Sequence, residues 1–183
     1  MILRSLNNMN VSVVDDFIPR EHFTELMKYI PKRIPWEYED YSVNVDDNVP
    51  QLVHVFYNEY RPQSEFFDDI LPVIHTINEL YSIVRIKVNG TIKGSILKKK
   101  PYHIDVIDDD TIPGKVIPAP SLKICIIMLN DNNGYTQIRD EKGNIKRVQS
   151  KANRALFFPN TYEHMGTNCT DQNLRMTLNI VYA

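Results

Sequence analysis

Short segments with the alternation of β-strands follow one another from about residue 82 to residue 183, and this pattern limits the fold more than any other feature of the sequence. The segments YSIVRIKVNG, RALFFP and LRMTLNIVY are rich in β-branched and aromatic residues, and SLKICIIMLN is a nearly continuous apolar run that suits a central strand covered on both faces. Turn residues at Asn132–Gly134 and Lys142–Asn144 have the composition that hairpins need. Many short strands separated by turns predict an antiparallel sandwich or jelly roll.

Two helical patterns precede these strands. Apolar residues recur at the spacing of one helix face within 19–31, and again over about 64–81, where Pro72 predicts a kink or a break into two helices. The two apolar stripes are Phe23, Leu26, Met27 and Ile30, and Phe67, Ile70, Leu71, Ile74 and Ile77. Helices followed by many strands predict the α+β class, with a double-stranded β-helix (jelly-roll) core backed by N-terminal helices. We expect one domain over 1–183, with a helical support region at about 1–82 and the jelly-roll core at about 83–183.

The charge balance and the cysteine count exclude several classes of protein. Lysine and arginine total 21 and aspartate and glutamate 23, so the chain lacks the broad basic surface that nucleic-acid binding usually needs, and Lys98–Lys100 is a local exception that suits a solvated loop. Two cysteines, Cys125 and Cys169, make no disulfide framework. The N-terminal residues do not resemble a signal peptide, and no apolar run reaches the ~18 residues of a membrane span. These features predict a cytoplasmic, reduced protein with no membrane partner.

His103 and Asp105 in YHIDV occupy alternate positions, so on an extended segment both side chains point to the same face. If the strand that carries His164 lies beside them, two nitrogens and one oxygen meet. This set is the facial triad that holds Fe(II) on one side and leaves other positions open. We expect structural or solvated roles for the other histidines and for the acidic run that follows the motif: His22, His54, His75 and Asp108–Asp110.

The alternation in LRMTLNIVY divides the last predicted strand into two faces. The apolar face suits packing beneath the helices and contains Leu174, Met176, Leu178, Ile180 and Tyr182. The opposite face would look into the barrel and contains Arg175, Thr177, Asn179 and Val181. An arginine aimed into a barrel is costly unless a carboxylate pairs with it, and a bidentate carboxylate suits it best. Either the chain's own acids or a bound ligand could supply that carboxylate.

The motif HxD in YHIDV, the later histidine in PNTYEHMGTN and the arginine after it resemble the iron- and 2-oxoglutarate-dependent dioxygenases. The segment VVDDFIPREHFTELMKYI resembles the opening of the prolyl-4-hydroxylase-like group, and the strand segments resemble small phage-type members of that superfamily. The resemblance implies that His103, Asp105 and His164 are the catalytic iron ligands, that Arg175 binds the distal carboxylate of 2-oxoglutarate, and that Thr177 assists it. It also implies O2 as co-substrate and hydroxylation of an sp3 C–H bond, with release of succinate and CO2.

Two positions depart from the pattern of this family. Many prolyl hydroxylases carry a tyrosine three residues before the first metal histidine and another near the end of the strand before LN, where this chain has Lys100 and Met128. These departures weigh against a standard peptidyl-proline substrate. The expected substrate is therefore an amino-acid side chain, in a peptide or free, and nucleic acid is less expected because the chain is nearly neutral.

Two readings from other functional classes stay open at this point. A zinc hydrolase would also use two histidines and a carboxylate with an open site, although no HExxH helix is present and Arg175 would have no evident use. A non-catalytic jelly-roll module, either metal-binding or viral and structural, would leave the ligand set and the inward arginine unexplained. Metal analysis together with a succinate assay separates these readings.

Overall fold

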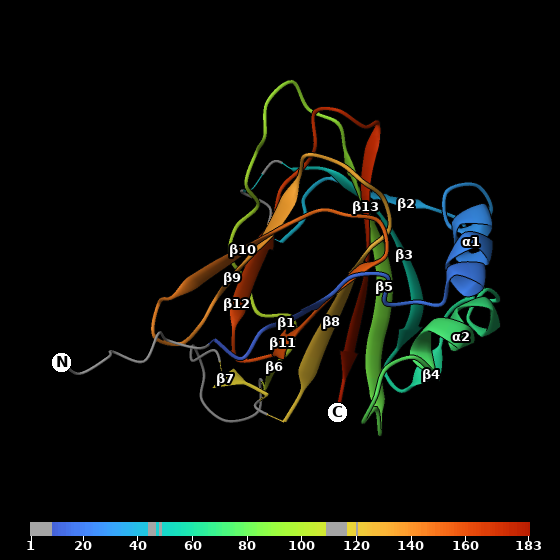
Figure 1. Cartoon of the computed structure of the whole chain (residues 1–183), viewed down its shortest axis with the longest axis horizontal. Helices are drawn as coiled ribbons and strands as arrows, with labels where there is room; N and C mark the ends of the chain where they lie inside the picture. Colours follow the sequence, from blue (N-terminus) through green and yellow to red (C-terminus); the bar gives the residue numbers. More distant parts are fainter. Residues whose placement is uncertain (1–8, 44–46, 48, 109–116, 120) are drawn as a thin grey trace.

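Two β-sheets face each other in the computed structural model, which describes residues 9–43, 47, 49–108, 117–119 and 121–183 (Figure 1). The larger sheet contains β1 (Ser12–Val14), β2 (Glu37–Glu39), β3 (Gln51–Asn58), β4 (Arg61–Pro62), β5 (Ile83–Ile92), β8 (Lys123–Met128), β11 (Arg154–Pro159) and β13 (Leu174–Tyr182). The smaller sheet contains β9 (Tyr135–Arg139), β10 (Ile145–Gln149) and β12 (Glu163–Gly166). The remaining elements are the ribbon of β6 (Ile107–Asp108) and β7 (Ile117–Pro118), helix α1 (Arg20–Tyr29), the 3-10 helix η1 (Asp68–Ile70) and helix α2 (Leu71–Ile74).

The strand order of the larger sheet is β1-β11-β8-β13-β5-β3-β2, with β4 paired to β3, and the pairings are antiparallel. The order of the smaller sheet is β10-β9-β12, and isolated backbone pairs Lys99–Thr167 and His103–His164 add the segment before β6 to its edge. Strands that neighbour each other in space therefore come from distant parts of the sequence. This crossed connectivity encloses an interior between the sheets, as in a jelly roll.

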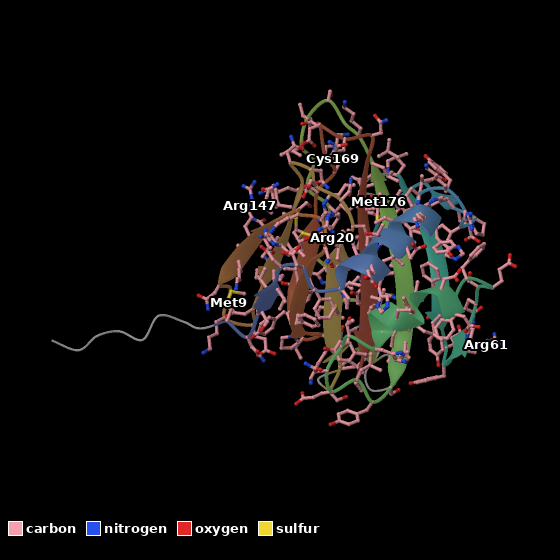
Figure 2. All side chains as sticks on the ribbon, turned by 45° about the vertical axis from the view of Figure 1, so that its right-hand side comes forward. Met9, Arg20, Arg61, Arg147, Cys169 and Met176 are labelled. Atoms are coloured by element: carbon pink, nitrogen blue, oxygen red, sulfur yellow. The ribbon has the colours of Figure 1, made fainter. Side chains whose placement is uncertain are left out.

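Apolar side chains cover both faces of the larger sheet. Helices α1 and α2 lie over its outer face, as Figure 2 shows from the side on which they come forward. The outer core includes Leu26, Ile30, Ile70, Ile74, Ile127, Leu178 and Ile180. The inner core lies between the two sheets and includes Ile124, Ile126, Met128, Ile138, Leu156 and Val181. Burial of each such side chain contributes roughly 1.5–3 kcal/mol to the stability of the fold. Strand β8 supplies residues to both cores, as its continuous apolar run predicts.

The predicted α+β jelly-roll class and the two faces of the last strand are confirmed. Helix α1 occupies the first helical pattern, and β13 buries its even-numbered residues in the outer core while Arg175 and Thr177 line the interior. The helical part of the fold is small, because α1 is the one helix of more than a single turn among the described residues.

The predicted helix over about 64–81 is wrong in its length, because only η1 and α2 form there. Pro72 lies in the first turn of α2, where the missing backbone N–H has no helical partner to lose. Glu79 has φ 54°, a left-handed conformation that excludes a helix at that point. The apolar stripe still packs against the outer core, and this packing explains the helical periodicity.

The description of 1–82 as a helical support region also needs correction. Strands β1, β2, β3 and β4 come from this region, and β3 pairs with β5 along most of its length. His54 lies in β3, and its ring nitrogens contact the Pro35 carbonyl at 2.9 Å and the Ser64 hydroxyl at 2.8 Å, which is the structural role expected of it. The pairing partners of these strands are distant in sequence, so the local pattern does not show that they join the larger sheet.

One of the two predicted hairpin turns is confirmed. The turn that contains Gly143, at φ 81°, joins β9 to β10. Asn132–Gly134 instead connects β8 in the larger sheet to β9 in the smaller sheet, so it changes sheets rather than closing a hairpin. Asp109 and Asp110 of the acidic run lie outside the described residues. Across the ranges that the structure describes, the helices are too short and too polar to cross a bilayer.

Candidate active site

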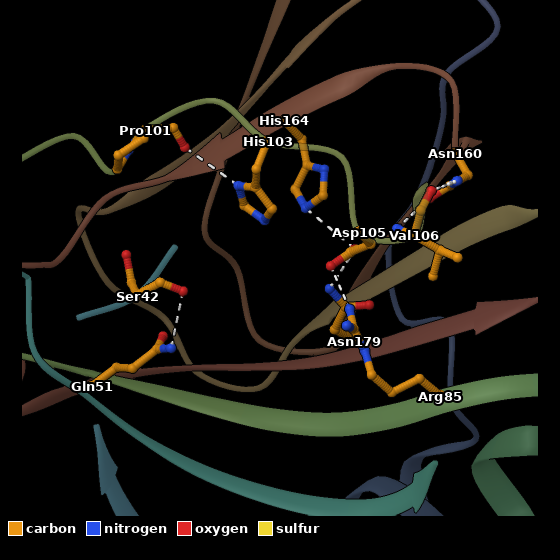
Figure 3. Close-up of polar contacts among 10 residues, drawn as sticks. All are labelled: Ser42, Gln51, Arg85, Pro101, His103, Asp105, Val106, Asn160, His164 and Asn179. Carbon is orange, nitrogen blue, oxygen red and sulfur yellow. Dashed lines mark hydrogen bonds and ion pairs between the residues drawn. The ribbon is translucent and has the colours of Figure 1, made fainter. Parts of the chain in front are cut away.

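His103 and His164 lie side by side because their backbones pair. The His103 N–H donates to the His164 carbonyl at 3.0 Å, and the His164 N–H donates to the His103 carbonyl at 2.9 Å. The two ring centroids are 4.3 Å apart. Asp105 joins them, and one potential ligand atom from each of the three residues lies within 4.8 Å of the others (Figure 3). The structure therefore brings together the three residues predicted as metal ligands, although 103–105 forms no regular strand.

Both histidines are held in the neutral form that binds metal. Nδ1 of His103 lies 3.3 Å from the Pro101 carbonyl, which leaves Nε2 for the cluster, and Nε2 of His164 lies 3.5 Å from Oδ2 of Asp105. Burial lowers the pKa of His103, and burial together with the neighbouring His103 lowers the pKa of His164 to about 3. Nδ1 of His164 is buried and has no hydrogen-bond partner in the described part of the chain.

The carboxylate of Asp105 is held by two strands of the larger sheet. Arg85 of β5 donates from Nη2 to Oδ1, and Asn179 of β13 donates from Nδ2 to Oδ2 at 3.0 Å (Figure 3). Burial alone would raise the pKa of Asp105, but the Arg85 guanidinium and the Asn179 amide favour the carboxylate and hold this pKa well below its usual range. The cluster therefore offers two neutral imidazoles and one fixed anion, a donor set that suits a divalent metal.

Arg175 lines the same cavity as the cluster. It comes four residues before Asn179 on β13, so the Cα atoms of these two residues are roughly 13 Å apart along the strand. Its side chain is buried, and it donates from Nε to the Ser150 hydroxyl at 3.0 Å and from Nη2 to the Thr136 hydroxyl at 2.9 Å. Among the residues that the structure describes, no carboxylate forms an ion pair with it. Burial lowers the pKa of Arg175 to about 10, so it stays charged at neutral pH. A buried guanidinium with hydroxyl partners alone is suited to an anionic ligand.

Two glycines leave room for the Arg175 side chain. A Cβ atom at Gly134 would lie 2.7 Å from Cδ of Arg175 and 2.6 Å from the Asn168 carbonyl oxygen, and one at Gly166 would lie 3.1 Å from Nη1 of Arg175. The space that the guanidinium occupies thus depends on hydrogen atoms at both positions. The sequence had indicated Gly134 only as a turn residue.

Two lysines add to the positive charge of the cavity wall. Nζ of Lys100 donates to Oε1 of Gln51 at 2.9 Å, and Nε2 of Gln51 donates to Oε2 of Glu39 at 2.8 Å, which fixes the orientation of the amide. Burial lowers the pKa of Lys100 to about 7, and the charge of Arg175 acts in the same direction. Lys87 of β5 lines the cavity as well, and burial lowers its pKa.

All five residues predicted for the site, His103, Asp105, His164, Arg175 and Thr177, line this one cavity. Sequence reasoning missed the residues that support them, chiefly Arg85, Lys87, Thr136 and Ser150. A signal for the first two was present in VRIKVNG, where Arg85, Lys87 and Asn89 alternate with apolar residues and must share a strand face. Thr136 and Ser150 carry no comparable signal, because their roles depend on where Arg175 reaches.

The fold of this chain is shared with solved oxygenase structures, while no protein-family model and no curated protein matches its sequence. A prolyl hydroxylase from Trichoplax adhaerens, in complex with a fragment of hypoxia inducible factor, aligns with a TM-score of 0.70 at 11% identity over 97% of this chain and 84% of that one. A prolyl-4-hydroxylase from Pseudomonas putida aligns with a TM-score of 0.66 at 15% identity over 94% and 91% of the two chains. HygX from Streptomyces hygroscopicus, with nickel and 2-oxoglutarate bound, aligns with a TM-score of 0.58 at 12% identity over 96% and 83%. At these identities the similarity shows the jelly-roll fold of the 2-oxoglutarate- and iron-dependent oxygenases.

Proposed function

We propose that this chain is an Fe(II)- and 2-oxoglutarate-dependent dioxygenase that hydroxylates an sp3 C–H bond and releases succinate and CO2. The observation that carries the proposal is one cavity that contains both a His-Asp-His cluster and a buried arginine without a carboxylate partner in the described residues. A fold shared with oxygenases, including one that holds nickel and 2-oxoglutarate, supports it.

His103, Asp105 and His164 would hold the metal, and their arrangement fits one. Both imidazoles are neutral, Asp105 is ionised, and one ligand atom of each residue lies within 4.8 Å of the others. Bound Fe(II) would supply the activation of O2 that hydroxylation of an unreactive C–H bond requires. Arg85 and Asn179 fix the carboxylate, so its orientation is set before any metal binds.

Arg175 would bind the distal carboxylate of 2-oxoglutarate through its guanidinium fork. The hydrogen bonds that Nε donates to Ser150 and Nη2 donates to Thr136 hold the planar guanidinium in place. Thr177 shares the inward face of β13 and would add a hydrogen bond, while Lys100 would add a second positive charge beside Arg175. The Arg175 end of the cavity would then neutralise the distal carboxylate of 2-oxoglutarate, and its keto acid group would lie at the His-Asp-His end.

For the prime substrate we propose an amino-acid side chain, in a peptide or free. The Trichoplax adhaerens prolyl hydroxylase is bound to a peptide fragment, which supports peptides as one class to test. Lys100, at the position where many prolyl hydroxylases carry tyrosine, donates to Gln51 here, so a standard prolyl pocket is not expected. One domain over residues 1–183 would carry the activity, and the phage-type likeness and a cytoplasmic location remain predictions of the sequence.

The other functional classes explain less of the cavity. A zinc hydrolase accounts for the cluster but gives no role to Arg175, and a non-catalytic jelly-roll module accounts for neither. The test is a turnover assay with purified protein, Fe(II), ascorbate, O2 and 2-oxoglutarate, in which succinate is measured with and without His103→Ala. Iron-dependent succinate formation that the substitution abolishes supports the dioxygenase. Zinc-dependent hydrolysis without succinate would support the hydrolase instead.

A further inference from the structure

Lys87 is a half-buried lysine in the cavity that the proposed chemistry leaves without a role. It lies on β5 between Arg85 and Asn89, with its side chain toward the interior, and β5 pairs with β13 on one side and β3 on the other. Unlike that of Lys100, its ammonium group forms no hydrogen bond and no ion pair among the described residues. A lysine in such a place is costly unless an anion joins it.

The charges around Lys87 do not balance within the described part of the chain. Lys87, Lys100 and Arg175 line the cavity, and the one acidic side chain beside them, Asp105, is already paired with Arg85. Glu39 acts on both lysines and Asp47 acts on Lys100, but neither carboxylate forms an ion pair with a lysine among the described residues. The Glu39 carboxylate accepts a hydrogen bond from Gln51, and the Asp47 carboxylate accepts from Ser42. The protein therefore supplies more positive than negative charge at this point.

The co-substrate does not account for all of this charge. 2-Oxoglutarate carries two carboxylates, and under the proposed function one meets the metal and the other meets Arg175. Lys100 donates to Gln51, and Gln51 and Arg175 both lie opposite Thr91 of β5, so Lys100 belongs to the distal end. Lys87 lies opposite Asn179, whose side chain donates to Asp105, so Lys87 belongs to the metal end, where the substrate's reacting carbon must also lie.

We infer that Lys87 binds the main-chain carboxylate of the prime substrate, so that the enzyme acts on a free amino acid or on the C-terminal residue of a peptide rather than on an internal residue. The inference rests on the proposed function and names the substrate class of the same site. Burial lowers the pKa of Lys87, and a carboxylate beside it favours the charged form again, which makes the acid a better ligand than its neutral amide.

The test measures binding to full-length protein loaded with Mn(II) and 2-oxoglutarate, which supports no turnover. The probes are free L-amino acids, their primary amides, and tripeptides ending in the same residues as acids and as amides. Relaxation of probe protons by Mn(II) reports binding close to the metal. We expect at least one acid to bind about tenfold more tightly than its amide, as one charge-assisted hydrogen bond predicts. The free acids and the tripeptide acids distinguish a free amino acid from a chain terminus.

Substitutions at Lys87 assign the preference to this residue. Lys87→Met should reduce the acid-to-amide ratio to about one, and Lys87→Arg should keep part of it. Lys93→Met, which removes an exposed lysine just beyond the same strand, is the matched control and should keep the full ratio. Equal binding of acids and amides to the wild type, or a ratio unchanged by Lys87→Met, overturns the inference. Binding of 2-oxoglutarate is measured first in the same samples, and its absence would instead overturn the proposed function.

Discussion

The guanidinium of Arg85 donates to Oδ1 of Asp105, so the carboxylate of the proposed metal cluster is fixed by a strand that carries none of the proposed ligands. Asn179 holds the other oxygen from the adjacent strand. The side chain of Asp105 is 4% exposed, and a buried carboxylate needs such partners to remain ionised. The proposed metal site is thus a property of the larger sheet as well as of the HxD segment.

Removal of the Arg85 guanidinium should weaken metal binding without eliminating it. For Arg85→Met we expect the affinity for Mn(II) or Co(II) to fall about 10- to 100-fold, because Asp105 loses the partner that orients it. Titration of metal-free protein by calorimetry measures this change. Arg61→Met is the control, since Arg61 is exposed at the edge of the larger sheet (Figure 2) and should have no effect. Unchanged metal affinity in Arg85→Met would show that Asp105 keeps its orientation without Arg85.

Removal of the Arg175 guanidinium should act on the co-substrate rather than on the metal. Arg175→Met should weaken 2-oxoglutarate binding by about 3 kcal/mol, because a charged bidentate contact is lost in a poorly solvated pocket. Arg175→Lys should restore part of the affinity at most, since one ammonium cannot match the fork. Calorimetry with Mn(II)-loaded protein measures both. An Arg175→Met protein that binds 2-oxoglutarate with unchanged affinity would contradict the assignment.

The low pKa of Lys100 predicts a specific dependence of stability on pH. Its pKa is about 7 in the folded chain and near 10.5 when exposed, so between these values the unfolded state binds more protons. The free energy of unfolding should therefore rise with pH from about 7 toward 10, by about 1.4 kcal/mol per pH unit from this group. Urea denaturation of metal-free wild type and Lys100→Met at pH 7, 8 and 9 isolates the effect. The free energy of unfolding of Lys100→Met minus that of the wild type should fall across the series, because only the wild type gains stability from this group as the pH rises. A constant difference would contradict the lowered pKa of Lys100.

The sequence is sufficient to predict the His-Asp-His cluster and the fold class because both depend on local spacing. The HxD pair, the alternation of LRMTLNIVY and the continuous run in β8 each express one strand geometry directly. The description of 1–82 as a helical region was wrong because β3 gains its place only through β5, a partner some thirty residues away. Arg85 was missed for the same reason, since its contact with Asp105 exists only once β5 lies beneath the HxD segment.

The most direct test of the central claim is anaerobic binding of 2-oxoglutarate to the Fe(II)-loaded protein, followed by exposure to O2. The account predicts a charge-transfer absorption band that needs both Fe(II) and 2-oxoglutarate, its decay in O2, and one succinate formed per 2-oxoglutarate consumed. His103→Ala with His164→Ala should remove the band and the succinate while far-UV circular dichroism still shows a folded protein. If this double variant keeps metal at full stoichiometry, or if the wild type forms no such band, the cavity is not the oxygenase site described here.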